Sequence, residues 1–478
     1  MTAQGLGRAV VVALAAGSNS AAAAEIDGAA LGLSWILPFA GILLSIALMP
    51  LLAPLFWHHN YGKIAAGWAL MFVLPFAALH GFGSALHLVA HTAFLEYLPF
   101  IILLLALFTV SGGIEIKGNL HGSPVVNTTF LGCGTLLASW TGTTGAAMLL
   151  IRPLLRANDG RRYNVHVVVF FVFLVANIGG SLTPLGDPPL FLGFLKGVSF
   201  FWTTIHLAVP MLVSSLALLV VFYFLDRHFY RKETDLPPRP DPTPASGVSI
   251  GGWRNVLLLA AIVGAVLMSG VWRPGVTFSV FGTELELQNI ARDALLLAIA
   301  GLSCYATPQR IHEANQFGWA PIKEVAKLFA GIFVTIIPAI AILRSGGDGA
   351  LAPLVALVTG PQGQPLNAAY FWLTGILSSF LDNAPTYLVF FNLAGGDAQQ
   401  LMGPLADTLT AISAGAVFMG ANTYIGNAPN FMVKAIAEER GVKMPSFFGY
   451  MAWSLAILVP LFLLLTLIFF GEAGGTTR

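Results

Sequence analysis

The sequence carries two copies of a short motif in which glycine and proline interrupt an apolar stretch, Gly186-Asp187-Pro188-Pro189 and Gly426-Asn427-Ala428-Pro429. Proline has no backbone N–H and clashes with the preceding turn, so each motif is expected to break a helix. A break frees backbone carbonyl and amide groups, which membrane proteins tolerate only where protein or water covers them. The motifs lie 240 residues apart, and this spacing organises the rest of the chain.

The composition is that of a membrane protein. Of the 478 residues, 56% are hydrophobic and only 9% are charged, whereas soluble domains carry about 25% charged residues. A net charge of +1 gives no electrostatic basis for nucleic-acid binding. The sequence contains no Walker A, His-Glu-x-x-His or Gly-x-Ser-x-Gly motif, which disfavours an enzyme.

Charge-poor stretches of about 20 residues, the length that crosses a bilayer, predict the membrane helices. They lie at 33–56, 64–82, 97–112, 166–192, 200–225, 254–271, 289–306, 328–343, 411–434 and 447–471. Two further stretches, 118–151 and 365–396, fit re-entrant hairpins, which enter the membrane partway and return on the same side. The predicted fold class is therefore an all-α polytopic membrane protein, with broken helices at 166–192 and 411–434.

Lysine and arginine orient the chain, because cytoplasmic loops are enriched in them. They cluster after the first hairpin and around 226–253, 310–327 and 434–443, whereas the loop at 395–407 has two aspartates and no basic residue. The first hairpin should then be cytoplasmic and the second should lie on the outer side. The two halves of the chain are expected to have opposite orientations in the membrane.

This orientation divides the chain into five parts. They are a signal-like segment or extra helix at 1–28, a first inverted repeat at 29–225, a cytoplasmic Pro-rich linker at 226–253, a second inverted repeat at 254–471 and a tail at 472–478. Each repeat is expected to hold about five membrane helices and one hairpin.

The 240-residue offset also aligns positions outside the two motifs. Thr183 aligns with Thr423 and Ser139 with Ser379, and the hairpin tip at 141–145 aligns with 381–385. Inverted repeats with broken helices indicate secondary transporters, whose binding sites lie at the repeat interface. A pair of ordinary Gly/Pro kinks is the alternative, which the aligned tips disfavour.

Two acidic residues, Asp187 and Asp382, lie in otherwise uncharged apolar stretches. A charged carboxylate is costly in hydrocarbon, so both should face the bundle interior and bind a cation or a proton. A carboxylate that binds Na⁺ and H⁺ in turn provides the minimal chemistry of an antiporter. Lys196 is the nearest base to Asp187, and we expect it to extend to the membrane interface.

The segments Asn177–Pro189 and Leu381–Thr386 resemble the ion transporter superfamily. That group includes NhaD-type sodium:proton antiporters, arsenite pumps, citrate–metal transporters and divalent-anion/sodium symporters. The sequence is most similar to bacterial proteins called sodium:proton antiporters or citrate transporters. The resemblance covers roughly residues 30–471.

The resemblance implies an elevator mechanism, in which a transport domain of two hairpins and two broken helices slides against a scaffold, within a homodimer. It implies no cofactor other than Na⁺ as a transported or coupling ion. It also implies a binding site at the two tips and two breaks. Carried over to this sequence, the site residues are Thr141, Thr143, Thr144, Asn177, Thr183, Gly186, Asp187, Asp382, Asn383, Thr386, Asn422, Thr423, Gly426 and Asn427.

The tips depart from the pattern of the Na⁺–dicarboxylate members, which carry Ser-Asn-Thr triplets. Here the tips read Thr-Gly-Thr-Thr and Leu-Asp-Asn-Ala. An acid at the tip disfavours an anionic substrate by about 1–4 kcal/mol at contact distance. The leading prediction is therefore exchange of Na⁺ or Li⁺ for H⁺, with Asp187 and Asp382 as the ion-binding carboxylates. The alternative is transport of citrate or another carboxylate coupled to a cation or metal, and a channel subunit or membrane enzyme is a third reading.

Overall fold

A computed structural model of the chain describes residues 26–234 and 246–471. The predicted signal-like segment lies almost entirely outside these residues, as does the predicted tail beyond residue 471. Among the described residues, eight helical segments are long and apolar enough to cross a membrane. They confirm a multi-pass, all-α membrane protein.

The eight spans overlap predicted ones, but two of them begin well before the predicted starts, at Pro54 instead of 64 and at Phe82 instead of 97. Their helices are α2 (Leu37–Leu52, preceded by η2, Leu33–Ile36), α3 (Pro54–His80), α4 (Phe82–Thr92) joined to α5 (Leu98–Gly112) by the π-helical turn η3 (Ala93–Tyr97), α10 (Trp202–Thr234), α11 (Trp253–Val271), α12 (Leu287–Ala306), α14 (Ala320–Arg344) and α21 (Phe447–Leu465, extended by η7, Thr466–Phe470). The shorter connecting elements are η1 (Gly28–Ala30), α13 (Gln309–Ala314), η5 (Gly346–Asp348), α15 (Ala352–Val358) and α18 (Ala398–Met402).

The stretches predicted as hairpins and broken helices are helices with interruptions. The first hairpin is α6 (Pro124–Thr141) and α7 (Thr143–Ala157), and the second is α16 (Asn367–Phe380) and α17 (Asn383–Leu393). The first broken helix consists of α8 (Val165–Leu174), the 3₁₀ turn η4 (Ile178–Ser181) and α9 (Pro188–Leu195); the second consists of α19 (Ala406–Phe418), η6 (Met419–Asn422) and α20 (Ala428–Glu439).

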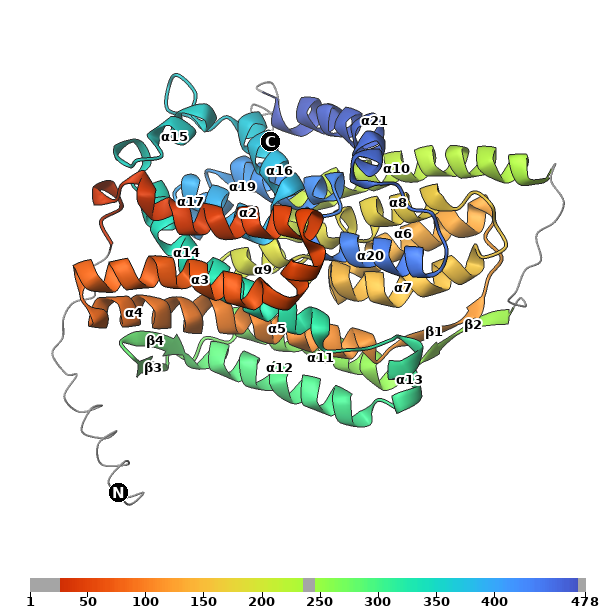
Figure 1. The fold of residues 1–478 in the computed structure, drawn as a ribbon, viewed down its shortest axis with the longest axis horizontal. Helices are drawn as coiled ribbons and strands as arrows, with labels where there is room; N and C mark the ends of the chain where they lie inside the picture. The colour runs from red at the N-terminus through yellow and green to blue at the C-terminus, as the bar shows by residue number, and fades with distance from the viewer. Residues whose placement is uncertain (1–25, 235–245, 472–478) are drawn as a thin grey trace, which may run out of the picture.

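Two short strand pairs, which the sequence did not predict, mark opposite ends of the bundle (Figure 1). Strand β1 (Glu115–Asn119) pairs with β2 (Ser246–Gly251), and β3 (Thr277–Val280) pairs with β4 (Thr283–Glu286), both antiparallel. Helix α13 lies at the β1/β2 end, where α14 begins. In the predicted orientation, this is the cytoplasmic end.

The predicted linker at 226–253 is shorter in the structure, because α10 continues to Thr234 and β2 occupies Ser246–Gly251. Asp226, at the predicted start of the linker, is fully buried. Arg161 Nη1 lies 2.6 Å and His166 Nε2 2.7 Å from its Oδ1, and Asn127 Nδ2 donates to Oδ2 at 3.0 Å. Because the charge of Asp226 is paired in this way, α10 can continue through a position where a loop was expected.

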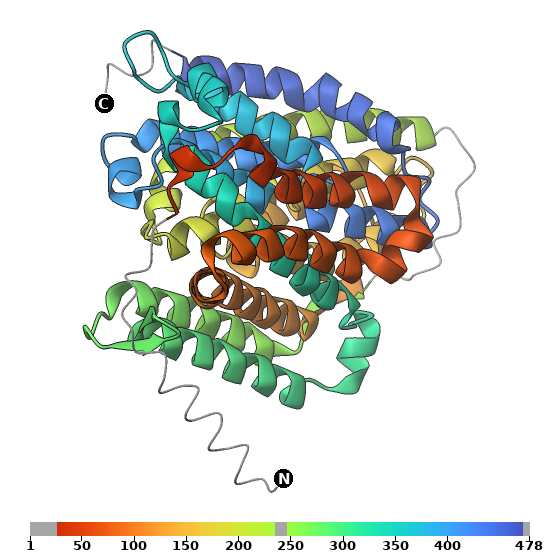
Figure 2. The ribbon, with the colours of Figure 1, turned by 60° about the vertical axis from the view of Figure 1, so that its left-hand side comes forward.

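The first segments of the two broken helices, α8 and α19, lie in the interior of the bundle (Figure 2). Every residue from Val167 to Leu174 in α8 is buried, and so is every residue from Thr408 to Phe418 in α19. Helices that are apolar or small on all sides belong in a core. Leu52, Leu70 and Leu74, on α2 and α3, are exposed, as expected of lipid-facing positions. The two breaks are therefore enclosed by other helices.

Candidate functional site

The two breaks share the same local hydrogen bonds. Thr183 Oγ1 donates to the carbonyl of Ser139 in the first half, and Thr423 Oγ1 donates to the carbonyl of Ser379 in the second. Each partner is 240 residues from its counterpart. In both halves a threonine of the break thus attaches the unwound segment to the neighbouring hairpin, which explains why the same residue types recur at this spacing.

The glycines of the two motifs allow the unwound chain to fold back on itself. A Cβ atom on Gly186 would lie 2.1 Å from the backbone carbonyl oxygen of Gly180, and one on Gly426 would lie 2.5 Å from that of Gly420. Real Cβ atoms do not approach backbone so closely, so no larger residue fits without moving the break. These glycines shape the site and supply no side chain to it.

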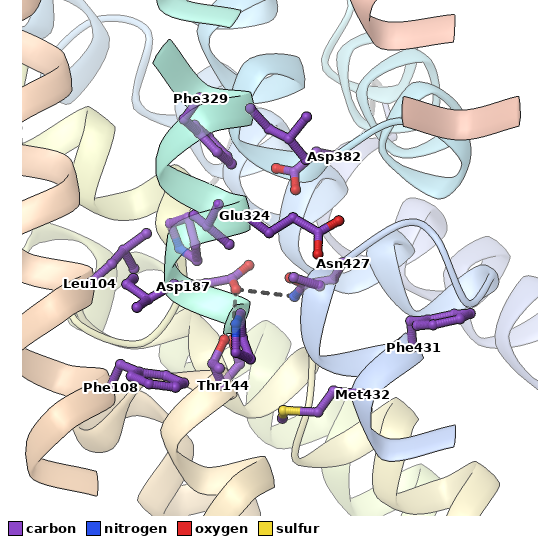
Figure 3. Close-up of a pocket in the computed structure, with 18 of the residues that line it drawn as sticks. Leu104, Phe108, Thr144, Asp187, Glu324, Phe329, Asp382, Asn427, Phe431 and Met432 are labelled. Atoms are coloured by element: carbon purple, nitrogen blue, oxygen red, sulfur yellow. Dashed lines mark hydrogen bonds between the residues drawn. The ribbon is translucent and has the colours of Figure 1, made fainter. Parts of the chain in front are cut away.

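Asp187 joins all four predicted elements. Its Oδ1 accepts a hydrogen bond from Thr143 Oγ1 at 3.0 Å and from Asn427 Nδ2 at 3.2 Å, and its Oδ2 accepts from Asn383 Nδ2 at 2.5 Å. The donors come from the first hairpin tip, the second break and the second hairpin tip. The carboxylate is 1% exposed. The structure therefore brings sequence-distant candidates together at one carboxylate (Figure 3).

Asn177 lies behind this group and contacts a residue that the sequence did not single out. Asn177 Nδ2 donates to Asn430 Oδ1 at 2.7 Å. Asn430 Nδ2 donates in turn to the carbonyls of Gly420 and Thr423, at 2.8 and 2.9 Å. Asn430 thus satisfies backbone groups that the second break leaves free. An amide in the first turn of α20 was the available signal, but the first half has Leu190 at the corresponding place.

A cavity of about 620 Å³ lies against this polar group. Seven of the predicted residues line it: Thr141, Thr143, Thr144, Gly186, Asp187, Asp382 and Asn427. The other seven are not among its lining residues: Asn177, Thr183, Asn383, Thr386, Asn422, Thr423 and Gly426. The structure thus divides the predicted residues into those that line the cavity and those that belong to the surrounding tips and breaks.

Asp382 lines the cavity without a hydrogen bond to Asp187. Its Oδ1 caps α17 by accepting from the backbone N–H of Ala384 at 3.0 Å, and Thr386 Oγ1 donates to its backbone carbonyl at 3.0 Å. Two buried amide oxygens near the second tip, Asn383 Oδ1 and Asn422 Oδ1, have no hydrogen-bond partner. Amide and carboxylate oxygens are ligands that hard cations accept.

Glu324 is a cavity residue that sequence reasoning missed. It lies on α14, and the Trp57 indole donates a hydrogen bond to it. The predicted span began only at residue 328, because Lys323 and Lys327 marked a loop, whereas α14 begins at Ala320. The carboxylates of Asp187, Glu324 and Asp382 all lie at the cavity in Figure 3. The lining contains no lysine or arginine, so its fixed charge is negative.

The cavity reaches the protein surface at the β1/β2 end of the bundle. Its lining there includes exposed residues at the start of α3, Pro54 and Leu55, and at the start of α14, Ala320 and Pro321. Among the described residues, no group of three His, Cys, Asp or Glu side chains is arranged as a metal site. A cation bound at Asp187 or Asp382 would therefore also need hydroxyl, amide or backbone oxygens.

The helical spans and a polar site at two helix breaks define a multi-pass membrane protein of the transporter class. Residues 28–470 match a family described as "Putative citrate transport", and the chain belongs to that family. The family is one of transporters, not of enzymes, and it supports the predicted resemblance at the level of citrate-transporter-type membrane proteins. The sodium:proton antiporters are not singled out by this match. A comparison with curated proteins finds no match.

Proposed function

We propose that this protein is a secondary active transporter that carries a citrate-type carboxylate together with a cation, as a complex with a divalent metal. One observation carries the proposal. The cavity of about 620 Å³ is far larger than a bare ion needs, yet three carboxylates and no lysine or arginine line it. Pockets of roughly 300–1,000 Å³ are those that hold small organic molecules.

Electrostatics explains why the cargo would be a complex. A free tricarboxylate would meet Asp187, Glu324 and Asp382, which carry the same sign of charge. A divalent metal lowers the net charge of the anion and is attracted to those carboxylates. The carboxylates of the cargo would instead face helix N-termini, because α7, α9, α17 and α20 all begin at the tips and breaks. Helix N-termini carry partial positive charge and favour anions.

Exchange of Na⁺ or Li⁺ for H⁺ is a second candidate function. Asp187 favours it, because a buried carboxylate with three hydrogen-bond donors is a site at which a proton and a cation can compete. The unpartnered oxygens of Asn383 and Asn422 offer further cation ligands. Under this proposal the large cavity is a water-filled path from the surface to the ion site.

We further infer an elevator architecture for either cargo. Residues 29–225 and 254–471 would be inverted repeats, which the matching hydrogen bonds of Thr183 and Thr423 support. The two hairpins and two broken helices would move together, because Asp187 joins them. The long apolar helices would form the scaffold. We propose a homodimer in the cytoplasmic membrane of a bacterium, with the β1/β2 end in the cytoplasm.

Purified protein in liposomes separates the two functions. Uptake of radiolabelled citrate should require a divalent cation such as Mg²⁺, and should fall to background when a chelator removes it. The same liposomes, with an imposed pH gradient and a pH-sensitive dye, report Na⁺- or Li⁺-dependent proton movement. Citrate uptake without any metal would contradict the complex. No citrate uptake together with Na⁺-dependent proton movement would establish antiport instead.

A further inference from the structure

An ion pair links the site helix α9 to its neighbour at the far end from the cavity mouth. Lys196 Nζ lies 2.5 Å from Glu96 Oε1, and the two side chains are only 19% and 12% exposed. Lys196 is the residue that caps the C-terminus of α9. Its charge is thus paired with a carboxylate, a contact that the sequence did not predict.

Helix α9 connects this ion pair directly to the site. It begins after Asp187, ends before Lys196 and is eight residues long, which corresponds to about 12 Å at 1.5 Å per residue. A helix this short behaves as a rigid rod between its two ends. Whatever holds Lys196 in place therefore also fixes the position of Asp187.

The partner residue, Glu96, lies in a rare local structure. The π-helical turn η3 interrupts an otherwise continuous helix from Phe82 to Gly112. Single π-helical turns persist mostly where a function requires them, because they are less stable than α-helix. Turn η3 contacts both α9 and β4, which places the ion pair toward the β3/β4 end, opposite the mouth (Figure 1).

Two other contacts join long helices of the bundle to helices of the first break and the second hairpin. The guanidinium of Arg292 on α12 lies 6.0 Å from the ring centre of Phe191 on α9. At the end of α14, Arg344 Nε donates to Asn392 Oδ1 on α17 at 2.9 Å. An ion pair with a hydrogen bond is stronger than either contact. The second half has the apolar Ile436 at the place that corresponds to Lys196, so this pairing belongs to the first half alone.

We propose that Glu96 and Lys196 are a positioning pair that holds Asp187 in the state in which the cavity is open at the β1/β2 end. Opening of the site toward the β3/β4 end requires α9 to move relative to η3, so the pair must break once in each cycle. The inference rests on the proposed transport function for its alternation between two states. It does not depend on which solute is carried.

Accessibility of a cysteine in the cavity tests the proposal without any substrate. Ala428 lines the cavity and is exposed within it. It is replaced by cysteine in a background in which the two native cysteines, Cys133 and Cys304, are serine. Right-side-out and inside-out vesicles are then labelled with a membrane-impermeant maleimide at one fixed pH, because His91 lies within electrostatic range of the pair.

With the pair intact, labelling should occur from the mouth side only. Glu96→Gln and Lys196→Met should each reduce that labelling at least threefold and produce labelling from the opposite side. The exchanged variant E96K/K196E should restore the original pattern. Arg310→Gln, which removes a surface ion pair with Glu115 between α13 and β1 at 3.0 Å, is the matched control and should change nothing.

Unchanged sidedness in both single variants, or an equal change in the control, would overturn the proposal. If Glu96→Gln does not accumulate in the membrane, Glu96→Asp takes its place; it keeps the charge but shortens the reach, and should give a smaller shift in the same direction. Failure of both citrate transport and antiport would reject the proposed function. The sidedness of labelling would still decide whether the pair positions Asp187. Active transport with unchanged labelling would reject the positioning pair alone.

Discussion

Replacing Asp187 by asparagine should abolish transport and leave the protein almost as stable as before. In the variant, Oδ1 still accepts from Thr143 and Asn427, the two donors that now lie 3.0 and 3.2 Å from it. The new amide nitrogen would face Asn383 Nδ2, which is a donor. Asn383 can resolve this conflict by turning its amide over, because its Oδ1 has no hydrogen-bond partner.

Replacing Asp187 by alanine should cost far more stability. All three donors lose their acceptor, but Asn427 Nδ2 keeps the carbonyl of Ala176 at 3.2 Å. Two buried donors, on Thr143 and Asn383, are then left without a partner. Each such group costs about 1–3 kcal/mol, so the loss should be about 2–6 kcal/mol. The asparagine variant should lose less than about 1 kcal/mol, since its hydrogen bonds are re-formed.

Thermal unfolding in detergent and transport in liposomes, measured on the same preparations, test this reasoning. Both variants should lose about tenfold or more of the transport rate, which corresponds to at least about 1.4 kcal/mol in the process that the charge supports. Only the alanine variant should unfold at a clearly lower temperature. If the asparagine variant is destabilised as much as the alanine variant, the proposed turn of the Asn383 amide is refuted. If the asparagine variant transports at the normal rate, the charge of Asp187 is not required for transport.

Three further substitutions test other parts of the structure. Glu324→Gln should make citrate uptake less dependent on the divalent metal, because it removes a repulsion of at most about 1–4 kcal/mol between Glu324 and the anion. The control Glu313→Gln, on the exposed surface of α13, should leave this dependence unchanged. Equal metal dependence in both variants would show that the charge of Glu324 does not select for the metal complex. Gly186→Ala should lower the unfolding temperature and stop transport, because its Cβ would meet a backbone carbonyl at 2.1 Å, whereas Gly264→Ala, with no atom within 4 Å, should be neutral or slightly stabilising. Asp226→Asn should cost about 1–3 kcal/mol of stability, because it removes the charge that faces the buried Arg161 and His166 while Glu233 remains 3.4 Å from Arg161. An unchanged unfolding temperature would show that the charge of Asp226 adds nothing to stability.

The sequence was sufficient for the features that depend on local chemistry. Low charge and apolar runs of about 20 residues set the class of protein, because lipid is the only solvent that suits them. Proline and glycine located both breaks to within a few residues, because these residues disrupt a helix wherever they occur. The common 240-residue offset predicted that Thr183 and Thr423 have matching positions, and the structure gives both threonines the same hydrogen bond.

Only the tertiary structure decided what these features do together. Asn383 donates to a carboxylate 196 positions away. Glu324 reaches the cavity from the first turns of α14, which local charge had assigned to a loop. Lys196 pairs with a residue 100 positions away. Such contacts depend on how helices pack, which no local pattern encodes. The volume of the cavity is likewise a property of the packed bundle. Because of this volume, the proposed cargo is a carboxylate carried together with a cation, and not a bare cation. The two motifs thus located the site, but the packing around them determined its size and charge.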